Sequence, residues 1–599
     1  MEPKEQRRYR LSIYLLALEA LVSSGILLFI PSDPNNSRFF GYSTTRFVFI
    51  FIISLAFLGF LTLAIGSLRH TDWYQKAVGL WAKLTSRWAR PVLYLSGLGI
   101  AVGLLAFLTR TYIPEAYLPV ATRLYPVVFF FAVACLHFFI LASYQTEPKE
   151  WQNALFVMLG GLLAVYYYAS ASYHAAYINR FSSRSDQDVF ISFAHRVLAS
   201  GFTDTGGRNQ MPLYAYLQAF FLDPKRPIDQ IFMIGKQLNI VLSMLLLAVL
   251  YPIFRKYFGR HEGINLFLIV AFSAFVYRAG YLQPELLYYF FAFLGFLYLG
   301  KMLAAPTFLR ALLGGLFLAL GHLTKASVLP AVFLFVVMFP LKELYTFYNR
   351  RKSEQPGGGN VRATLIRWAS FALLLVTFLG VLSPYLQESK QIWGKYFFNV
   401  NTTFYIWYDT FTEAKQGTRA HGEGEGWPNM PPDEIPSLQK YLREHTPAQI
   451  LERIRIGLGL QARTLWSGYG LFNFHLFYLA VLLVLTVLLW RQNQALIRAQ
   501  LALIVFSGLY FAGYIFSIAW YYPIGGGENQ RFTFALFVSF MFAVFLAVDK
   551  MLAGVESVRL LGKQIPTAKL QNGLNWFVSL ALAVDILIYV PIRLQQIVF

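Results

Sequence analysis

The chain has 599 residues, of which 57% are hydrophobic and only 14% are charged. A soluble domain carries about 25% charged residues, so this composition excludes an ordinary soluble globular protein. The formal net charge is +21, but most Lys and Arg residues lie in short segments between long apolar runs. This is the positive-inside pattern of membrane proteins, and it argues against a nucleic-acid partner. The single cysteine, Cys135, excludes an intrachain disulfide.

Apolar runs long enough to cross a bilayer recur along the whole chain. The N-terminus is basic and then apolar, without a small-residue cleavage site, so we expect a retained first span. The sequence therefore predicts an all-α, polytopic integral membrane protein. We place about 15 spans at 11–30, 47–67, 92–109, 126–144, 154–172, 237–254, 263–279, 284–300, 311–323, 327–342, 368–385, 471–490, 500–520, 532–549 and 574–592.

The basic loops indicate the topology. With the N-terminus in the cytoplasm, all of the long Lys/Arg-rich loops fall on the cytoplasmic side, and we expect a bacterial inner or plasma membrane. Two short crossings, 311–323 and 327–342, preserve this agreement and place the turn "HLTKAS" just inside the outer surface.

We divide the chain into four parts. An N-terminal extension of four spans (1–153) is followed by a central membrane module (154–385), which contains a first outer loop (173–237). A large non-cytoplasmic loop (386–470) then precedes the C-terminal spans (471–599).

The stretch "RSDQDVFISFAHRVLASGF" carries two acids in otherwise apolar surroundings. Apolar residues at helical spacing predict a helix over 186–200 that lies flat in the outer interface. Asp186 and Asp188 have three interpretations. Ser185 and Asp188 could form a capping box, Asp186 could be a general base facing a lipid-borne substrate, and the two acids could bind a divalent metal.

Two cations are also candidates for function. Lys325 is an ionisable residue at membrane depth, where its ammonium could meet a lipid phosphate or simply snorkel to the interface. The Arg531 guanidinium could bind phosphate through two nitrogens or act as an ordinary flanking anchor. Glu285, at the entrance of a span, could instead be a structural partner of Arg278.

Several motifs, taken in order over about 154–550, resemble a known family. Asp186 stands four positions before Phe190, "RNQMPLY" follows, and "YLQPELLYYFF", "GHLTK" and "GGGENQRFTF" come later. This set resembles the polyprenyl-phosphate-sugar-dependent glycosyltransferases of the GT-C fold, which are related to protein O-mannosyltransferases and to lipid A aminoarabinose transferase. Gln187 replaces the second acid that is more usual in the family, and the first four spans have no counterpart.

The resemblance implies a GT-C-like bundle with interfacial helices and one large outer loop. It implies inverting transfer of a sugar from a polyprenyl-phosphate donor to a glycan, lipid or protein acceptor on the non-cytoplasmic side. Asp186 would be the catalytic base, with Asp188 as a second catalytic candidate. The donor phosphate would be bound by Lys325, Arg531 and Arg208, and Glu285 would contact substrate.

Other candidate substrate contacts are Tyr214, in an aromatic interface element, and Trp407 and Asp409, in the long loop. Aromatic rings suit the apolar faces of sugars, although the same rings could simply pack the loop on the membrane surface. The expected partners are thus the lipid-linked donor, its acceptor and membrane lipids.

The predicted chemistry requires no cofactor, but a divalent cation such as Mg²⁺ or Mn²⁺ stays open. Asp186 and Asp188 would be its ligands, and Asp204, Glu285 and Glu528 could complete the site. Residues two apart in a helix point about 200° from each other, which favours the metal-free alternative.

Two other classes of function remain. A transporter or lipid flippase would carry polar residues at mid-membrane, often in broken spans. The predicted spans are nearly free of charge at their centres, which favours an interfacial enzyme. A non-catalytic assembly scaffold is the third class.

Overall fold

The computed structural model describes residues 3–29, 39–69, 71–112, 118–143, 146–180, 186–206, 209–352, 361–420, 430–467, 473–525, 530–560 and 563–596. The chain forms two compact units, Met1–Tyr173 and His174–Phe599. This division falls after helix α6, about one helix later than the boundary predicted at residue 153.

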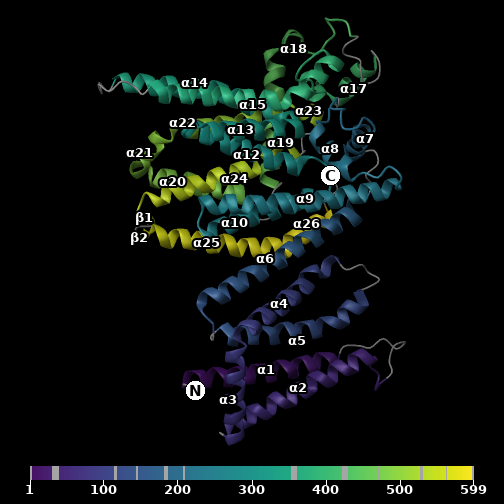
Figure 1. The fold of residues 1–599 in the computed structure, drawn as a ribbon, viewed down its shortest axis with the longest axis vertical. Coiled ribbons are helices and arrows are strands. Elements are labelled where there is room, and N and C mark those ends of the chain that lie inside the picture. The colour runs from purple at the N-terminus through teal and green to yellow at the C-terminus, as the bar shows by residue number, and fades with distance from the viewer. Residues whose placement is uncertain are drawn as a thin grey trace. The chain divides into compact units, whose positions relative to one another are not determined.

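The first unit consists mainly of helices (purple and blue in Figure 1), with an isolated antiparallel bridge between Phe39 and Tyr42. Its α3 is polar along one side and apolar along the other, as expected of a helix at an interface. The elements are α1 (Pro3–Phe29), α2 (Thr44–Leu68), α3 (Asp72–Arg87), α4 (Ala89–Leu108), η2 (Thr109–Tyr112), α5 (Leu118–Ser143) and α6 (Pro148–Tyr173).

The second unit begins with a π-helical turn and contains the remaining helices and a two-stranded antiparallel hairpin. Its first half comprises η4 (His174–Ile178), α7 (Asp186–Ala199), α8 (Pro212–Phe221), α9 (Ile228–Tyr257), α10 (Arg260–Val270), η5 (Ala271–Phe275), α11 (Val276–Ala279), α12 (Glu285–Ala304), α13 (Phe308–Thr324), η6 (Ala326–Val328), α14 (Leu329–Lys352) and α15 (Val361–Trp393). Its second half comprises α16 (Val400–Thr403), η7 (Tyr405–Trp407), α17 (Phe411–Ala420), α18 (Leu438–Glu444), α19 (Pro447–Ser467), α20 (Phe474–Leu488), α21 (Trp490–Ala499), α22 (Leu501–Trp520), α23 (Tyr522–Gly525), α24 (Gln530–Ala553), β1 (Ser557–Leu560), β2 (Lys563–Pro566), α25 (Thr567–Val584), η9 (Asp585–Tyr589) and α26 (Val590–Gln596).

Among the described residues, 12 helices are long and apolar enough to cross a membrane, or 13 if the pair α20 and α21, bent by 107°, counts as one span. Every predicted span falls on one of these helices or on one of two shorter apolar helices, Val127–Ser143 and Phe308–Thr324. The prediction of an all-α, multi-pass membrane protein is confirmed. The number of crossings and their orientation stay predictions.

The central helices of the second unit are buried on all sides. Residues 270–290 are buried without exception, and α12 continues as the core of the unit, whereas α15 and α22 expose most of their apolar surface. An apolar helix that is buried all round needs other helices, and not lipid, as its neighbours. The irregular segment 280–284 therefore lies inside protein, as backbone at membrane depth must when it is not helical.

Different groups of elements lie at the two ends of the second unit. In Figure 1, α7, α8, α17 and α23 gather at one end of the long helices, and α21 and the β1–β2 hairpin lie at the opposite end. The predicted outer segments and the predicted cytoplasmic loops are thus separated. The helix predicted over 186–200 is present as α7, and the break predicted at "HLTKAS" separates α13 from α14. The location of α7 at the membrane interface stays a prediction.

Helices α13 and α15 approach closely because glycine replaces a side chain between them. A Cβ atom on Gly315 would lie 2.5 Å from the carbonyl oxygen of Leu374 and 2.8 Å from the side chain of Thr377. Small residues of this kind allow helix backbones in membranes to touch.

We therefore expect Gly315→Ala to destabilise the protein by about 1–3 kcal/mol, because the added methyl group overpacks a backbone contact. The measurement is thermal unfolding in detergent. Gly380→Ala is the matched control, since Gly380 also lies in a helix of this pair but a Cβ atom there would meet no neighbouring helix within 4 Å. Equal unfolding midpoints for the two variants would contradict the close contact.

Candidate functional site

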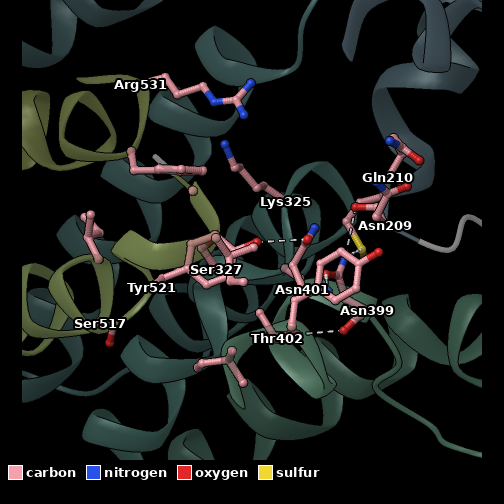
Figure 2. A pocket seen from close by; sticks show the side chains of 18 of the residues that line it. Asn209, Gln210, Lys325, Ser327, Asn399, Asn401, Thr402, Ser517, Tyr521 and Arg531 are labelled. Carbon is pink, nitrogen blue, oxygen red and sulfur yellow. Dashed lines mark hydrogen bonds between the residues drawn. The ribbon is translucent and has the colours of Figure 1, made fainter. Parts of the chain in front are cut away.

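The second unit contains a cavity of about 960 Å³. This volume lies at the upper end of the range of about 300–1,000 Å³ that is typical of ligand pockets. Its lining comes from the start of α7, α12 and α24, from the turn between α13 and α14, from α22, and from the segment 399–415. Segments distant in sequence therefore combine to form one chamber (Figure 2).

One ion pair in the cavity joins Asp186 to Arg531. Asp186 is the first residue of α7, where the helix dipole favours a carboxylate, and Arg531 is the second residue of α24. The guanidinium Nη1 donates to Asp186 Oδ2. The Asp186 side chain remains 49% exposed, so this carboxylate is accessible to a ligand while it is paired.

A second ion pair joins Glu285 to Lys325, with 3.2 Å between Oε1 and Nζ. Glu285 is the first residue of α12, and Lys325 ends α13 in an extended conformation. Both positions match the helix dipole, which favours an acid at the N-terminus and a base at the C-terminus. The Glu285 side chain is only 4% exposed, so its charge depends on the lysine.

Aromatic residues hold the two pairs together. The Phe532 ring lies 4.7 Å from the Lys325 ammonium and 5.2 Å from the Arg531 guanidinium carbon, so both cations contact one ring. Tyr289 of α12 donates a hydrogen bond of 2.8 Å to the carbonyl of Arg531, and Tyr514 of α22 donates to the carbonyl of Ser327. In Figure 2 the head groups of Lys325 and Arg531 point toward one another.

Apart from Lys415, the rest of the cavity is lined by neutral polar groups and apolar residues. Asn399 donates to the carbonyl of Asn209 (2.9 Å), and Tyr521 donates to Asn401 Oδ1 (2.9 Å), so the long loop is tied to two other segments. Gln210 and Thr402 also line this wall (Figure 2). Amides and hydroxyls that are already oriented by one hydrogen bond are suited to a polyhydroxylated ligand.

Chemically, the cavity combines an accessible carboxylate with two cations a short distance away. The carboxylate can accept a proton from a bound hydroxyl. The cations can bind an oxyanion, because guanidinium and ammonium both form charge-assisted hydrogen bonds with phosphate oxygens. The Nε atom of Arg531 is buried and has no hydrogen-bond partner among the described residues.

Of the predicted site residues, Asp186, Glu285, Lys325 and Arg531 come together in the cavity. Asp188 does not line it, and Tyr214 is fully buried in the core, where its hydroxyl accepts a hydrogen bond of 2.9 Å from Gln218. Three further predicted residues, Arg208, Ser185 and Glu528, lie outside the described residues.

Asp409 and Trp407 belong to a different cluster. Asp409 accepts from Arg453 (3.0 Å), His445 (2.7 Å) and Tyr441 (3.3 Å), and the Trp407 ring lies 6.2 Å from that of Tyr441. Neither residue lines the cavity. The aromatic density of the long loop is largely explained by a small core of its own around Phe398, Val400, Phe404, Tyr405 and Ala414.

Sequence reasoning missed the amide wall of the cavity. Asn399, Asn401 and Tyr521 line the cavity, and they carry no signal in the sequence beyond their place in predicted outer segments. Lys415, at the edge of the cavity in α17, was also missed.

The geometry of the metal candidates differs from that of a chelating pair. Asp186 and Asp188 both lie in the first turn of α7, and side chains two positions apart in a helix point in nearly opposite directions. Asp204 forms an ion pair with Arg196, with 3.1 Å between the two side chains. Among the described residues, no group of three or more His, Cys, Asp or Glu side chains could hold a metal ion. Metal dependence stays an open prediction.

Comparisons of the chain with protein-family models, with curated proteins and with solved structures found no match.

The cluster around Asp409 gives a pH-dependent prediction. Both ring nitrogens of His445 face oxygen acceptors, Asp409 Oδ2 and the Tyr441 carbonyl (2.9 Å), and only the protonated ring satisfies both. Burial and the Arg453 charge lower the pKa of His445, but the hydrogen bonds and the charge of Asp409 outweigh them and raise it above its ordinary value of 6.5.

A raised pKa means that the contribution to stability is complete below about pH 6.5 and is lost as the pH rises through the folded-state value. We expect the unfolding midpoint of the parent to fall more steeply between about pH 6 and about pH 9 than that of His445→Gln, which cannot titrate. Parallel pH profiles for the two proteins would show that His445 is not charged in this cluster.

Proposed function

We propose that the chain is a membrane glycosyltransferase with a GT-C-like fold that transfers a sugar from a polyprenyl-phosphate donor to a hydroxyl acceptor. The observation that carries this proposal is the pairing of Asp186 with Arg531 and of Glu285 with Lys325 in one cavity beside apolar helices. A lipid-borne phosphate needs cations at the end of the spans, and an acceptor hydroxyl needs an accessible base. Both requirements are met within one chamber.

In the proposed reaction, the acceptor oxygen attacks the anomeric carbon while its proton passes to Asp186. The bond between the anomeric carbon and the phosphate oxygen breaks, and its electron pair leaves with the polyprenyl phosphate. Attack from the face opposite the leaving group inverts the anomeric configuration. The negative charge that develops on the phosphate is stabilised by Lys325 and Arg531, so positioned electrostatics supply much of the rate.

The ion pairs suggest why the cavity is ordered before the donor arrives. Arg531 and Lys325 are each held by a carboxylate, so they need little rearrangement to receive a phosphate. A phosphate that binds Arg531 competes with Asp186 for the guanidinium. Donor binding would therefore loosen the contact that holds Asp186 and leave its carboxylate better able to take the proton of the acceptor hydroxyl.

The general-base role predicts a large effect of Asp186→Asn. The amide keeps the shape of the side chain but does not accept a proton, so turnover should fall by about 10²-fold or more. Some stability should also be lost, because only 24% of the Arg531 side chain is exposed and its guanidinium loses a charged partner, so transfer is normalised to the amount of folded protein. The assay is transfer of radiolabelled sugar from mixed polyprenyl-phosphate donors by membranes that contain each variant.

Asp188→Asn is the matched control, since Asp188 lies in the same helical turn but does not line the cavity. It should retain parental transfer. If Asp186→Asn also keeps near-parental turnover, or if both variants lose it equally, Asp186 is not the base.

The phosphate-binding role of Lys325 predicts weaker use of the donor. Lys325→Met should raise the apparent donor KM by about tenfold or more, because a charge-assisted contact is worth roughly 1.5–3 kcal/mol. This variant also leaves the Glu285 carboxylate buried without its cation, which should destabilise the protein by about 3–5 kcal/mol.

The double variant Glu285→Gln/Lys325→Met separates the two effects. It removes both charges together, so thermal stability should recover, while donor use should remain weak. If the double variant uses the donor as well as Glu285→Gln alone does, Lys325 has only a structural role.

A further inference from the structure

The segment 280–284 joins α11 to α12 outside any regular helix, yet every residue in it is buried. Backbone N–H and C=O groups that are removed from water need partners, and an unsatisfied group is strongly destabilising in an apolar environment. This segment leads directly to Glu285. The partners of its backbone groups therefore help to decide where that carboxylate lies.

Three buried side-chain amides supply many of these partners. From α9, Asn239 Nδ2 lies within hydrogen-bonding distance of the carbonyls of Tyr281 (2.7 Å) and Ala279 (3.2 Å). From the end of η4, Asn179 Nδ2 donates to the carbonyl of Gly280 (3.0 Å).

The third amide is that of Gln187, in the first turn of α7, whose Oε1 accepts the backbone N–H of Leu282 at 3.0 Å. The three amide-bearing residues, Asn179, Gln187 and Asn239, are 5%, 2% and 1% exposed.

Gln187 is also joined to Asn179 by a reciprocal amide pair. Asn179 Nδ2 donates to Gln187 Oε1 (3.1 Å), and Gln187 Nε2 donates to Asn179 Oδ1 (3.2 Å). The backbone carbonyl of Asn179 in turn accepts from the buried ammonium of Lys236. Gln187 thus occupies a fixed position with both ends of its amide engaged.

The location of Gln187 connects the two ion pairs. It directly follows Asp186 in the chain, and it binds Leu282, three residues before Glu285. One side chain therefore links the start of α7, which carries Asp186, to the segment that carries Glu285. The link requires a group that accepts and donates at once, which an amide does and a carboxylate or an alkyl chain does not.

We propose that Gln187 is a positioning residue whose amide sets the separation of the Asp186 and Glu285 carboxylates, and with it the placement of the base relative to the donor phosphate. This inference rests on the proposed transferase function. It also explains why an amide, and not the acid more usual in the resembling family, suits position 187. A carboxylate there would face the side-chain oxygen Oδ1 of Asn179 and bury a further negative charge beside Asp186.

The experiment compares Gln187→Met with Gln218→Met. Both substitutions remove a buried amide, but the hydrogen bonds of the Gln218 amide go to Tyr214 and to the carbonyl of Gly235, whereas the Gln187 amide binds the backbone of the segment 280–284 directly. The readouts are thermal unfolding, kcat and donor KM, measured with the radiolabelled polyprenyl-phosphate donors in detergent. Activity is normalised to the amount of folded protein.

We expect both variants to lose stability, but only Gln187→Met to lose kcat, by about tenfold or more, with a donor KM close to that of the parent. A displacement of about 1 Å at reacting groups can cost on the order of 10²-fold in rate, so a kcat effect without a KM effect marks a positioning role. Gln187→Asn is the second variant. It keeps the amide but shortens the link by one methylene group, so kcat should fall even where the Met variant does not fold.

The outcomes are distinct. A parental kcat in Gln187→Asn, or equal losses of kcat in the two Met variants, overturns the positioning role. A parent protein that transfers sugar from none of the donors overturns the transferase function and this inference with it.

Discussion

Two carboxylates and two cations share one end of an apolar helical unit, and none of them can remain unpaired when it is shielded from water. Removing an ion from water costs several kcal/mol even after relaxation, and a close partner of opposite charge offsets most of that cost. The Glu285–Lys325 pair is the more deeply buried, and the Asp186–Arg531 pair is the more accessible. Much of the surrounding structure holds these four side chains in place.

The long helices contribute to this arrangement through their ends. Glu285 begins α12, Asp186 begins α7, and Lys325 ends α13, so three of the four charges match the helix dipole at their own terminus. The positive charge of Arg531 lies near the start of α24, where it interacts unfavourably with the helix dipole, and the negative charge of Asp186 offsets this. The buried amides of Asn179, Gln187 and Asn239 then satisfy the irregular backbone that lies between these helices.

The segment after α15 closes the cavity and is itself held by charge. Arg453, with only 4% of its side chain exposed, binds Asp409 and the carbonyls of Ile406 and Trp520. Tyr405 and Ile406 line the cavity, so the same arginine fixes part of its wall. A buried arginine with several oxygen acceptors is a strong local restraint, because each contact is charge-assisted. This part of the cavity wall is therefore held in place by the Arg453 cluster and not by the two ion pairs inside the cavity.

The amino-acid sequence alone determined the class of protein and the position of the apolar helices, because the length and composition of a spanning segment are local properties. It also determined that Asp186, Glu285, Lys325 and Arg531 are exceptional, since ionisable residues at the ends of apolar segments are costly and few. The helix over Asp186–Ala199 could be predicted from its period, and the break at Lys325 from the charge balance of the loops.

Only the tertiary structure decided which charges meet. Asp186 and Arg531 are 345 positions apart, and no periodicity relates them. The structure likewise removed Asp188 and Tyr214 from the cavity, moved Asp409 and Trp407 to another cluster, and added Asn399, Asn401 and Tyr521. Polar side chains of loops carry little sequence signal because their environment comes from segments distant in the chain. The position of Gln187 has the same origin, because the backbone group that it binds, the N–H of Leu282, lies 95 positions away in the chain.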